Sequence, residues 1–309
     1  MSFSCVCTQR MGYNKAVSGF SRAQEGDTEK KRMRLPEKHA SSNLKIVISL
    51  IIIGVVAFLS IGAPYFASAD PLAVDLHNVL QPPGQGHLLG TDEMGRDVWS
   101  RLLHGGRVSV LVGFTAMLVS ICLGTVYGAF SGYAGGIIDR LMMRGVDVML
   151  ALPNLFIVIV FMAVAGPSLF NVILIIGFTG WMQTARLVRT EVLSLKQREF
   201  VLAARAAGTP LWKQIVKHML PHFAPTVTVM ATVGVGHAML TETTASFLGL
   251  GIPPHQPSWG NMLMGAQSYV LTGAWWVVVF PGAMIVLTVM AVTLLGDWLE
   301  ERYLRKRNE

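Results

Sequence analysis

The stretch VSVLVGFTAMLVSICLGTVYGAF, residues 108–130, carries no charged residue. A helix rises about 1.5 Å per residue, so about 20 apolar residues cross the roughly 30 Å of hydrocarbon in a bilayer. Five other stretches share this length and character: 46–66, 146–165, 169–187, 223–247 and 276–296. The sequence therefore predicts an all-α integral membrane protein with six transmembrane helices.

The composition agrees with this class. Of 309 residues, 52% are hydrophobic and 14% are charged, whereas soluble domains average about 25% charged residues. We expect a flexible cytoplasmic tail over residues 1–44, a membrane domain over 45–300 and a basic cytoplasmic tail over 301–309. The first 40 residues lack the apolar core of about 7–15 residues that a cleavable signal peptide needs.

The basic residues orient the six spans. Nine of the 25 lysines and arginines precede the first span, two separate the second from the third, and four follow the sixth. Seven lie between the fourth and fifth spans when Arg186 is counted with the loop that it borders. The alternate connections hold the remaining three. Because short cytoplasmic loops are enriched in Lys and Arg, we expect both termini in the cytoplasm. This bias accounts for most of the net charge of +7 and requires no nucleic-acid partner.

The cytoplasmic connection at residues 198–221 is the most informative one. Its alanines and Leu202 favour a first helix, and Gly208 can end that helix in the left-handed conformation. We expect Thr209 to cap a second helix with Pro210 at its first position. Pro221 then ends this second helix before the fifth span. The result is a cytoplasmic helix–turn–helix in which small side chains lie beside basic ones.

This stretch resembles the EAA loop of ABC importer permeases, in which Glu-Ala-Ala is followed at fixed spacing by Gly, Ile and Leu-Pro. The matching positions here are Leu202-Ala203-Ala204, Gly208, His218 and Leu220-Pro221. Leu202 and His218 replace the Glu and the Ile of that pattern. The resemblance implies that this loop couples the membrane domain to an ATPase.

Three further segments resemble one branch of these permeases, the C-type subunit of the dipeptide/oligopeptide/nickel family. They are GTDEMGRD at residues 90–97, SFLGLG at 246–251 and PSWG at 257–260. The resemblance covers roughly residues 45–300. It implies the type I ABC importer permease architecture in a bacterial or archaeal cytoplasmic (inner) membrane.

The resemblance also implies a division of labour among several chains. No Gly-Lys dipeptide occurs in the sequence, so the phosphate-binding Walker A pattern is absent. We expect no catalytic residue and no cofactor of its own, with ATP and Mg²⁺ bound by two partner ATPase subunits. The other expected partners are a second permease subunit, an extracytoplasmic solute-binding protein and membrane lipid. The expected cargo is a short peptide, with nickel or a metal chelate as the alternative.

The external connection contains a second charged pattern. Asp92 or Thr91 can cap a helix, and the apolar residues that follow repeat at helical spacing, with Arg96 and Arg101 on the other side. We expect a short amphipathic helix at the outer interface, with Asp97 in the same segment. Two roles remain open: sealing the periplasmic mouth, or docking the solute-binding protein.

Ionisable residues within spans are costly and are therefore candidates for function. His237 and Glu242 lie five residues apart in the fifth span, which places them on different faces of a helix. Glu242 can bind the ammonium group of a peptide or a polar group of the partner permease. His237 can line the path, bind a metal or simply pack. We expect Asp147 and Asp297, near span ends, to be anchors.

Two weaker patterns complete the analysis. Glycines recur every four residues at positions 124, 128, 132 and 136, a stripe suited to close helix approach, either within the chain or against the partner. Cys5 and Cys7 supply too few ligands for a closed metal site. We expect them and Cys122 to be reduced thiols, and we assign no metal site.

Overall fold

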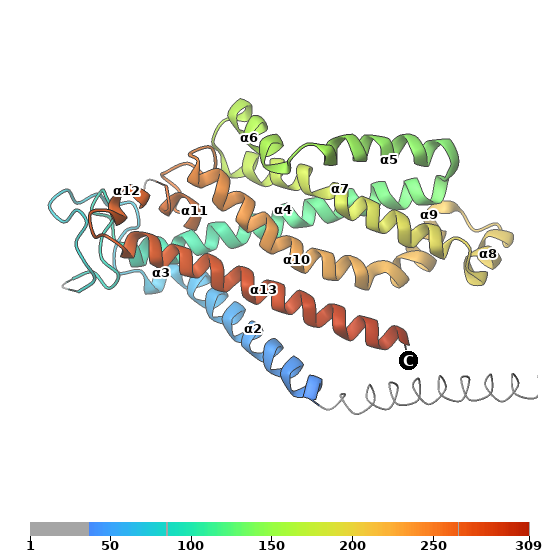
Figure 1. Cartoon of the computed structure of the whole chain (residues 1–309), viewed down its shortest axis with the longest axis horizontal. Helices are drawn as coiled ribbons and strands as arrows, with labels where there is room; N and C mark the ends of the chain where they lie inside the picture. The colour runs from blue at the N-terminus through green and yellow to red at the C-terminus, as the bar shows by residue number, and fades with distance from the viewer. Residues whose placement is uncertain (1–36, 85, 265, 309) are drawn as a thin grey trace, which may run out of the picture. The chain divides into compact units, whose positions relative to one another are not determined.

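The computed structural model describes residues 37–84, 86–264 and 266–308 (Figure 1). The described residues form helices and no strand, and their only β-bridge pairs Thr91 with Asp97. The helices are α2 (Glu37–Ile61), α3 (Ala63–Phe66), α4 (Val98–Ala134), α5 (Gly136–Ala151), α6 (Asn154–Ala165), α7 (Leu169–Leu195), α8 (Glu199–Ala206), α9 (Leu211–Lys213), the π-helix η1 (Gln214–Met219), α10 (Leu220–Phe247), α11 (Trp259–Met262), α12 (Ala266–Val270) and α13 (Trp276–Asn308). The all-α fold class is thus confirmed.

The chain divides into two units, Met1–Val47 and Ile48–Glu309. Helix α2 begins at Glu37, inside the stretch that the sequence analysis assigned to a flexible tail. The rest of that tail, with Cys5 and Cys7, lies outside the described residues. Everything that follows concerns the second unit.

Fewer than six of the described helices are both long enough and apolar enough to cross a membrane. Within the described residues, four stretches are: Leu44–Ile61, Val98–Ala134, Leu211–Phe247 and Trp276–Tyr303. Helix α7 is not among them, because its apolar first half gives way to Gln183, Arg186 and Arg189. The count of six spans is therefore not confirmed.

The predicted span over residues 146–165 is not one continuous helix. The chain breaks between α5 and α6, and the two helices are bent by 84°. Pro153 lacks the N–H that a continuing helix needs and forces the preceding Leu152 into an extended conformation. The pair makes a fifth crossing only if it acts as one broken span.

Helices α4 and α7 lie side by side along most of their length (Figure 1). Gly128 makes this contact possible: a Cβ placed there would lie 2.3 Å from the backbone oxygen of Ala185. Gly124 and Gly132 approach the backbone of α7 in the same way. Of the two roles left open for the glycine stripe, packing within the chain is confirmed for these three positions. Gly136 meets no atom there.

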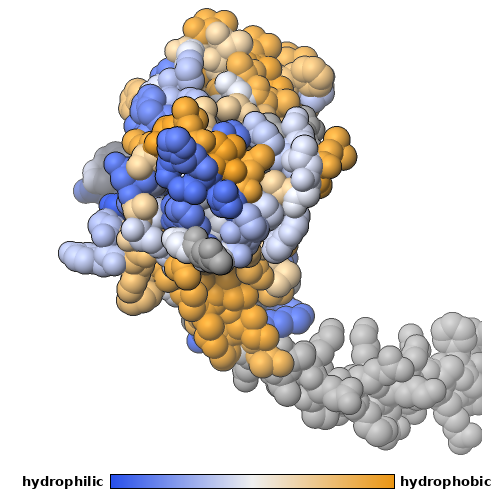
Figure 2. Space-filling model, turned by 90° about the vertical axis from the view of Figure 1, so that its left-hand side faces the viewer, coloured by the Kyte–Doolittle hydropathy of each residue, from blue (hydrophilic) through white to orange (hydrophobic). Residues whose placement is uncertain are grey.

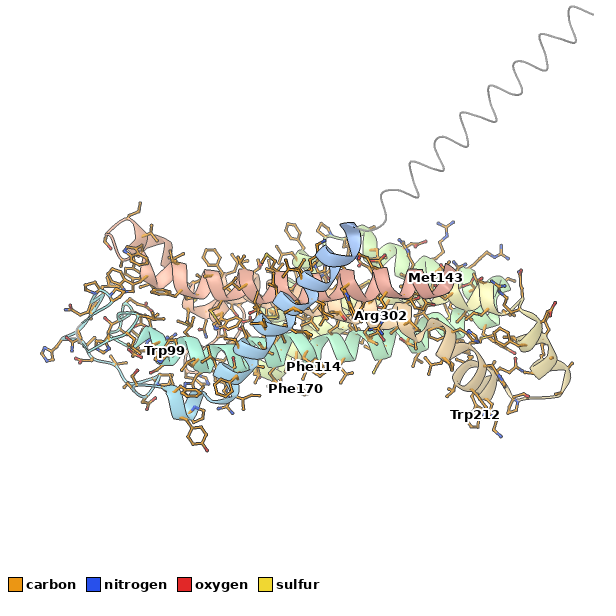
Figure 3. All side chains as sticks on the ribbon, turned by 90° about the horizontal axis from the view of Figure 1, so that it is seen from below. Trp99, Phe114, Met143, Phe170, Trp212 and Arg302 are labelled. Atoms are coloured by element: carbon orange, nitrogen blue, oxygen red, sulfur yellow. The ribbon has the colours of Figure 1, made fainter. Side chains whose placement is uncertain are left out.

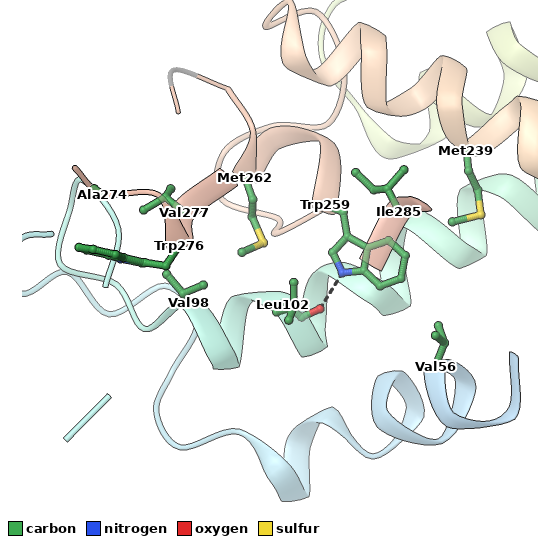
Figure 4. Packing of buried hydrophobic residues seen from close by; sticks show 10 residues of the cluster. All are labelled: Val56, Val98, Leu102, Met239, Trp259, Met262, Ala274, Trp276, Val277 and Ile285. Atoms are coloured by element: carbon green, nitrogen blue, oxygen red, sulfur yellow. Dashed lines mark hydrogen bonds between the residues drawn. The ribbon is translucent and has the colours of Figure 1, made fainter. Parts of the chain in front are cut away.

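The largest apolar core surrounds Trp259 on α11 (Figure 4). The Trp259 ring is fully buried, and its Nε1 donates a hydrogen bond of 2.8 Å to the backbone oxygen of Leu102 on α4. The cluster also contains Val56 of α2, Met239 of α10 and Ile285 of α13. This core ties the N-terminal part of α4 to four other helices.

Large apolar side chains also cover much of the outer surface, as expected for a chain that faces lipid. Phe114 on α4 and Phe170 on α7 are both exposed (Figure 3). Viewed end-on, the face formed by the loops near α11 gathers hydrophilic residues, with hydrophobic ones above and below (Figure 2).

Candidate functional sites

The turn between α8 and α9 takes the conformation that the sequence predicts. Gly208 has a φ of +73°, in the left-handed region that other residues resist. Its N–H donates to the backbone oxygen of Arg205 (3.0 Å), and the N–H of Thr209 donates to that of Ala204 (3.1 Å). These two bonds form a Schellman motif, which satisfies carbonyls at the helix end. The prediction that Gly208 ends the first helix is confirmed.

The second helix begins and continues differently from the prediction. Pro210 is the N-cap of α9 and makes no side-chain capping bond, so the assignment of the cap to Thr209 is wrong. Pro221 does not end the helix either. The π-helix η1 precedes α10, and Pro221 lies in the first turn of α10. The wider π turn accommodates the missing N–H, so the helix runs on into the next span.

The segment from α8 to η1, residues 199–219, exposes apolar side chains. Leu202, Leu211, Trp212 and Val216 are all exposed, and Trp212 is exposed by 61%. The Lys213 ammonium lies 5.5 Å from the centre of the Trp212 ring. Of the other predicted residues, Ala203 and Pro221 are exposed, whereas Ala204 and Leu220 are half-buried. The segment thus offers another protein a surface of small, apolar and basic side chains.

One buried side chain that the sequence analysis missed holds this segment in place. Gln214 on η1 is 3% exposed, and its Nε2 donates to the backbone oxygen of Thr209 (2.6 Å). Its Oε1 accepts from the hydroxyl of Tyr133, at the end of α4 (2.8 Å). Lys196 in turn donates to the backbone oxygen of Tyr133. Gln214 therefore connects the Gly208 turn to α4.

The opposite end of the unit, which we call the Asp92 end (residues 67–84, 86–109 and 252–263; Figure 1), contains a cluster of buried charges. Oδ1 of Asp92 accepts from the backbone N–H groups of Met94 and Arg96, both at 2.9 Å. Its Oδ2 lies 2.7 Å from Nε of Arg96 and 3.4 Å from Nε of Arg101. All three charged side chains are less than a tenth exposed. Asp92 thus organises a buried ionic cluster.

The prediction of a short amphipathic helix in this segment is wrong. Val98–Ala134 is one continuous helix of 37 residues, so residues 98–107 extend the second span. Asp97, and neither Asp92 nor Thr91, is its N-cap, and Oδ2 of Asp97 accepts from Ser100 N (2.8 Å). The sequence analysis named Asp92 or Thr91 because Asp and Thr both cap helices. In the fold, the Asp92 carboxylate instead binds Arg96 and nearby backbone N–H groups.

The loop before this cluster is also held by an aspartate. The backbone N–H of Asp75 donates to Met94 O (3.1 Å), and its Oδ2 accepts from the Asn78 side chain (2.8 Å). This side-chain hydrogen bond is the main cause that lowers the pKa of Asp75. Asp75 itself is exposed.

Comparison with known proteins now decides the family. Residues 124–307 match the binding-protein-dependent transport system inner membrane component family. The chain belongs to this family. It is 36% identical over 289 residues to the dipeptide transport system permease protein DppC of Bacillus subtilis, covering 93% of this chain and 88% of that protein. It is 36% identical over 260 residues to the oligopeptide transport system permease protein OppC of the same organism, covering 84% and 85%. The family resemblance seen in the sequence is confirmed.

As a member of this family, the permease is a multi-pass protein of the bacterial inner membrane. Two ionisable residues of α10, His237 and Glu242, face different surroundings, as their spacing predicted. Glu242 is fully buried, and its carboxylate accepts from the hydroxyls of Ser246 (2.8 Å) and Ser109 (3.3 Å). His237 is exposed and lines a cavity. The hydrogen-bond partners observed for the Glu242 side chain are therefore residues of this chain.

Two ion pairs join α5 to α7 in the permease, and the sequence analysis identified neither. The guanidinium of Arg189 binds both carboxylate oxygens of Asp139, at 2.5 and 2.6 Å, and Ser131 of α4 donates to the same carboxylate. Asp147, expected to be an anchor, pairs with Arg186 at 2.5 Å. The sequence contains all five residues, but their pairing depends on helix packing.

No described group of three or more His, Cys, Asp or Glu residues in the permease is arranged to hold a metal ion. Cys122 is a free, exposed thiol on α4.

Proposed function

We propose that this chain is the transmembrane permease subunit of an ABC importer that moves short peptides across the cytoplasmic membrane. ATP is hydrolysed on two separate ATPase subunits, which hold the nucleotide and its Mg²⁺. The observation that carries the proposal is the exposed segment of residues 199–219, whose Gly208 turn and apolar side chains suit a docking surface. The peptide cargo is inferred from the relatives, which are dipeptide and oligopeptide transport proteins.

In this proposal the segment is the coupling element. Its apolar and basic side chains enter a groove of an ATPase subunit, and closure of the paired ATPases moves the segment as a rigid body. Gln214 passes that movement to α4 because it bonds to both the Gly208 turn and Tyr133. Rocking of the packed helices then opens the cavity that His237 lines first to one side of the membrane and then to the other.

The proposed assembly contains four further proteins in addition to membrane lipid. A second permease subunit completes the path, two ATPase subunits supply energy, and an extracytoplasmic binding protein delivers the cargo. The distribution of basic residues supports cytoplasmic termini and a cytoplasmic coupling element.

A deletion strain tests the proposal. The gene is deleted and restored on a plasmid, and uptake of a labelled dipeptide and of nickel is measured in both strains. We expect dipeptide uptake to be lost on deletion and recovered on restoration, with nickel uptake unchanged. Loss of nickel uptake with intact dipeptide uptake would replace the peptide cargo by nickel. Unchanged uptake of both would refute import of either cargo.

A further inference from the structure

A cavity of 380 Å³ opens between α4, α7 and α10, beside the break between α5 and α6. Small-molecule sites commonly measure about 300–1,000 Å³. Broken helices are tolerated within membranes where they line a cavity, and in many transporters such breaks form the substrate site. The size and position of this cavity are therefore those of a transport site.

The polar lining of the cavity is free of fixed charge. No Asp, Glu, Lys or Arg is among the described residues that line it. Hydrogen-bonding groups come from amides, hydroxyls and one imidazole, among them Ser120, Asn154, Gln183, His237 and Thr241. A charged cargo group therefore meets neither a fixed opposite charge nor a fixed like charge from this lining.

Several of these groups have unused hydrogen-bonding capacity. The Ser120 hydroxyl is buried and has no partner among the described residues. Within the same part of the chain, the side chains of Asn154, Gln183 and His237 make no hydrogen bond. The Thr241 hydroxyl donates to the backbone oxygen of His237 (2.8 Å) and keeps its own lone pairs free. A ligand with both donors and acceptors would satisfy this set.

The apolar part of the lining is unusually rich in methionine. Met117, Met149, Met182 and Met230 all face the cavity, each from a different helix. Methionine is unbranched and polarisable, and it adapts its shape to different partners. Such a wall can accommodate side chains of different size without a dedicated pocket.

We infer that this cavity is the chain's share of the cargo path and binds the main-chain amide of a short peptide through neutral groups. It does not select for the charge of the peptide's side chains. This inference rests on the proposed function. An amide group has one donor and one acceptor, which match the unpaired groups of the lining. A bare divalent metal ion would find one imidazole and no carboxylate there.

Charged substitutions at Gln183 test the inference in the complete importer, in cells. Uptake of Ala-Lys, Ala-Ala and Ala-Glu is measured for wild type, Gln183→Lys and Gln183→Glu. We expect the Ala-Lys to Ala-Glu uptake ratio to fall roughly tenfold below wild type in Gln183→Lys and to rise similarly in Gln183→Glu. Gln183→Asn, which adds no charge, should keep the wild-type ratio. Each ratio comes from one variant, so it does not depend on how much protein reaches the membrane.

The outcomes separate this inference from the proposed function. A wild-type importer that takes up dipeptides, together with unchanged ratios in both charged variants, would overturn the cavity assignment alone. A wild type that takes up no dipeptide would overturn the proposed function and the peptide inference together. If a Gln183 variant transports nothing, Thr241→Lys and Thr241→Asp are measured instead, with the same expected signs and the same overturning result.

Discussion

The Asp92 end and the coupling element (residues 199–219) are both connections between long helices, and both mix charged, apolar and glycine residues. At the Asp92 end the charges of Asp92, Arg96 and Arg101 are buried and paired, and Trp259 fills the core beneath them. In the coupling element several large apolar side chains are exposed, and Gln214 bonds the turn to α4. Similar residue types thus hold one end together and leave the other available to a partner.

The largest effect is expected at the Asp92 end. Asp92→Ala leaves the guanidinium groups of Arg96 and Arg101 buried without their shared carboxylate, and it removes the acceptor of two backbone N–H groups. We expect a loss of about 3–5 kcal/mol in the free energy of unfolding, measured by thermal unfolding of the purified protein in detergent.

Glu93→Ala is the matched control. Glu93 is 27% exposed and contacts the same Arg96 at 2.9 Å, so its loss should cost under about 1 kcal/mol. Equal destabilisation by the two substitutions would show that burial of the Asp92 cluster does not decide its strength.

A smaller loss is expected at Glu242. Glu242→Leu leaves the hydroxyls of Ser246 and Ser109 without their acceptor, which should cost about 2 kcal/mol of stability. Glu242→Gln keeps an acceptor oxygen and should retain both stability and peptide uptake. Loss of uptake in a stable Glu242→Gln permease would instead assign the carboxylate a direct role with the cargo.

In the coupling element, Gly208→Val should affect transport more than folding. The backbone strain costs about 1–2 kcal/mol, and a Cβ at this position meets no atom of the chain within 4 Å. We expect uptake and substrate-stimulated ATPase activity of the assembled importer to fall roughly tenfold. Gly208→Asn tolerates the left-handed conformation better and should retain more activity. Wild-type activity in Gly208→Val would remove this turn from the coupling mechanism.

The smallest effect on stability is expected for Trp212→Ala. Because the side chain is 61% exposed, the change in unfolding free energy should stay within about 0.5 kcal/mol. Its affinity for the ATPase subunit, measured by binding of purified subunits, should fall roughly tenfold, since exposed tryptophans often anchor interfaces. Trp275→Ala provides the control, because Trp275 is 50% exposed on the loop before α13. An equal loss of affinity in both variants would contradict the assignment of the docking surface.

The sequence predicted local conformation best where one residue type has a special backbone preference. Gly208 ends α8 in the left-handed region because no side chain opposes it there. Prediction failed where the role of a residue depends on the structure around it. Pro221 lies within a continuing helix that a π turn precedes. Asp97 caps α4 because it directly precedes Val98, where the helix begins, whereas Asp92 binds the arginines.

By itself, then, the sequence determined that this chain is helical and membrane-embedded, that it resembles the ABC importer permeases, and where the Gly208 turn lies. These properties follow from runs of apolar residues and from short motifs, which act over a few turns of chain. Only the tertiary structure decided that Gln214 bonds to Tyr133, that Asp139 binds Arg189, and that Gln183 and His237 line one cavity. Such residues come from helices distant in the sequence, and helix packing alone brings them together.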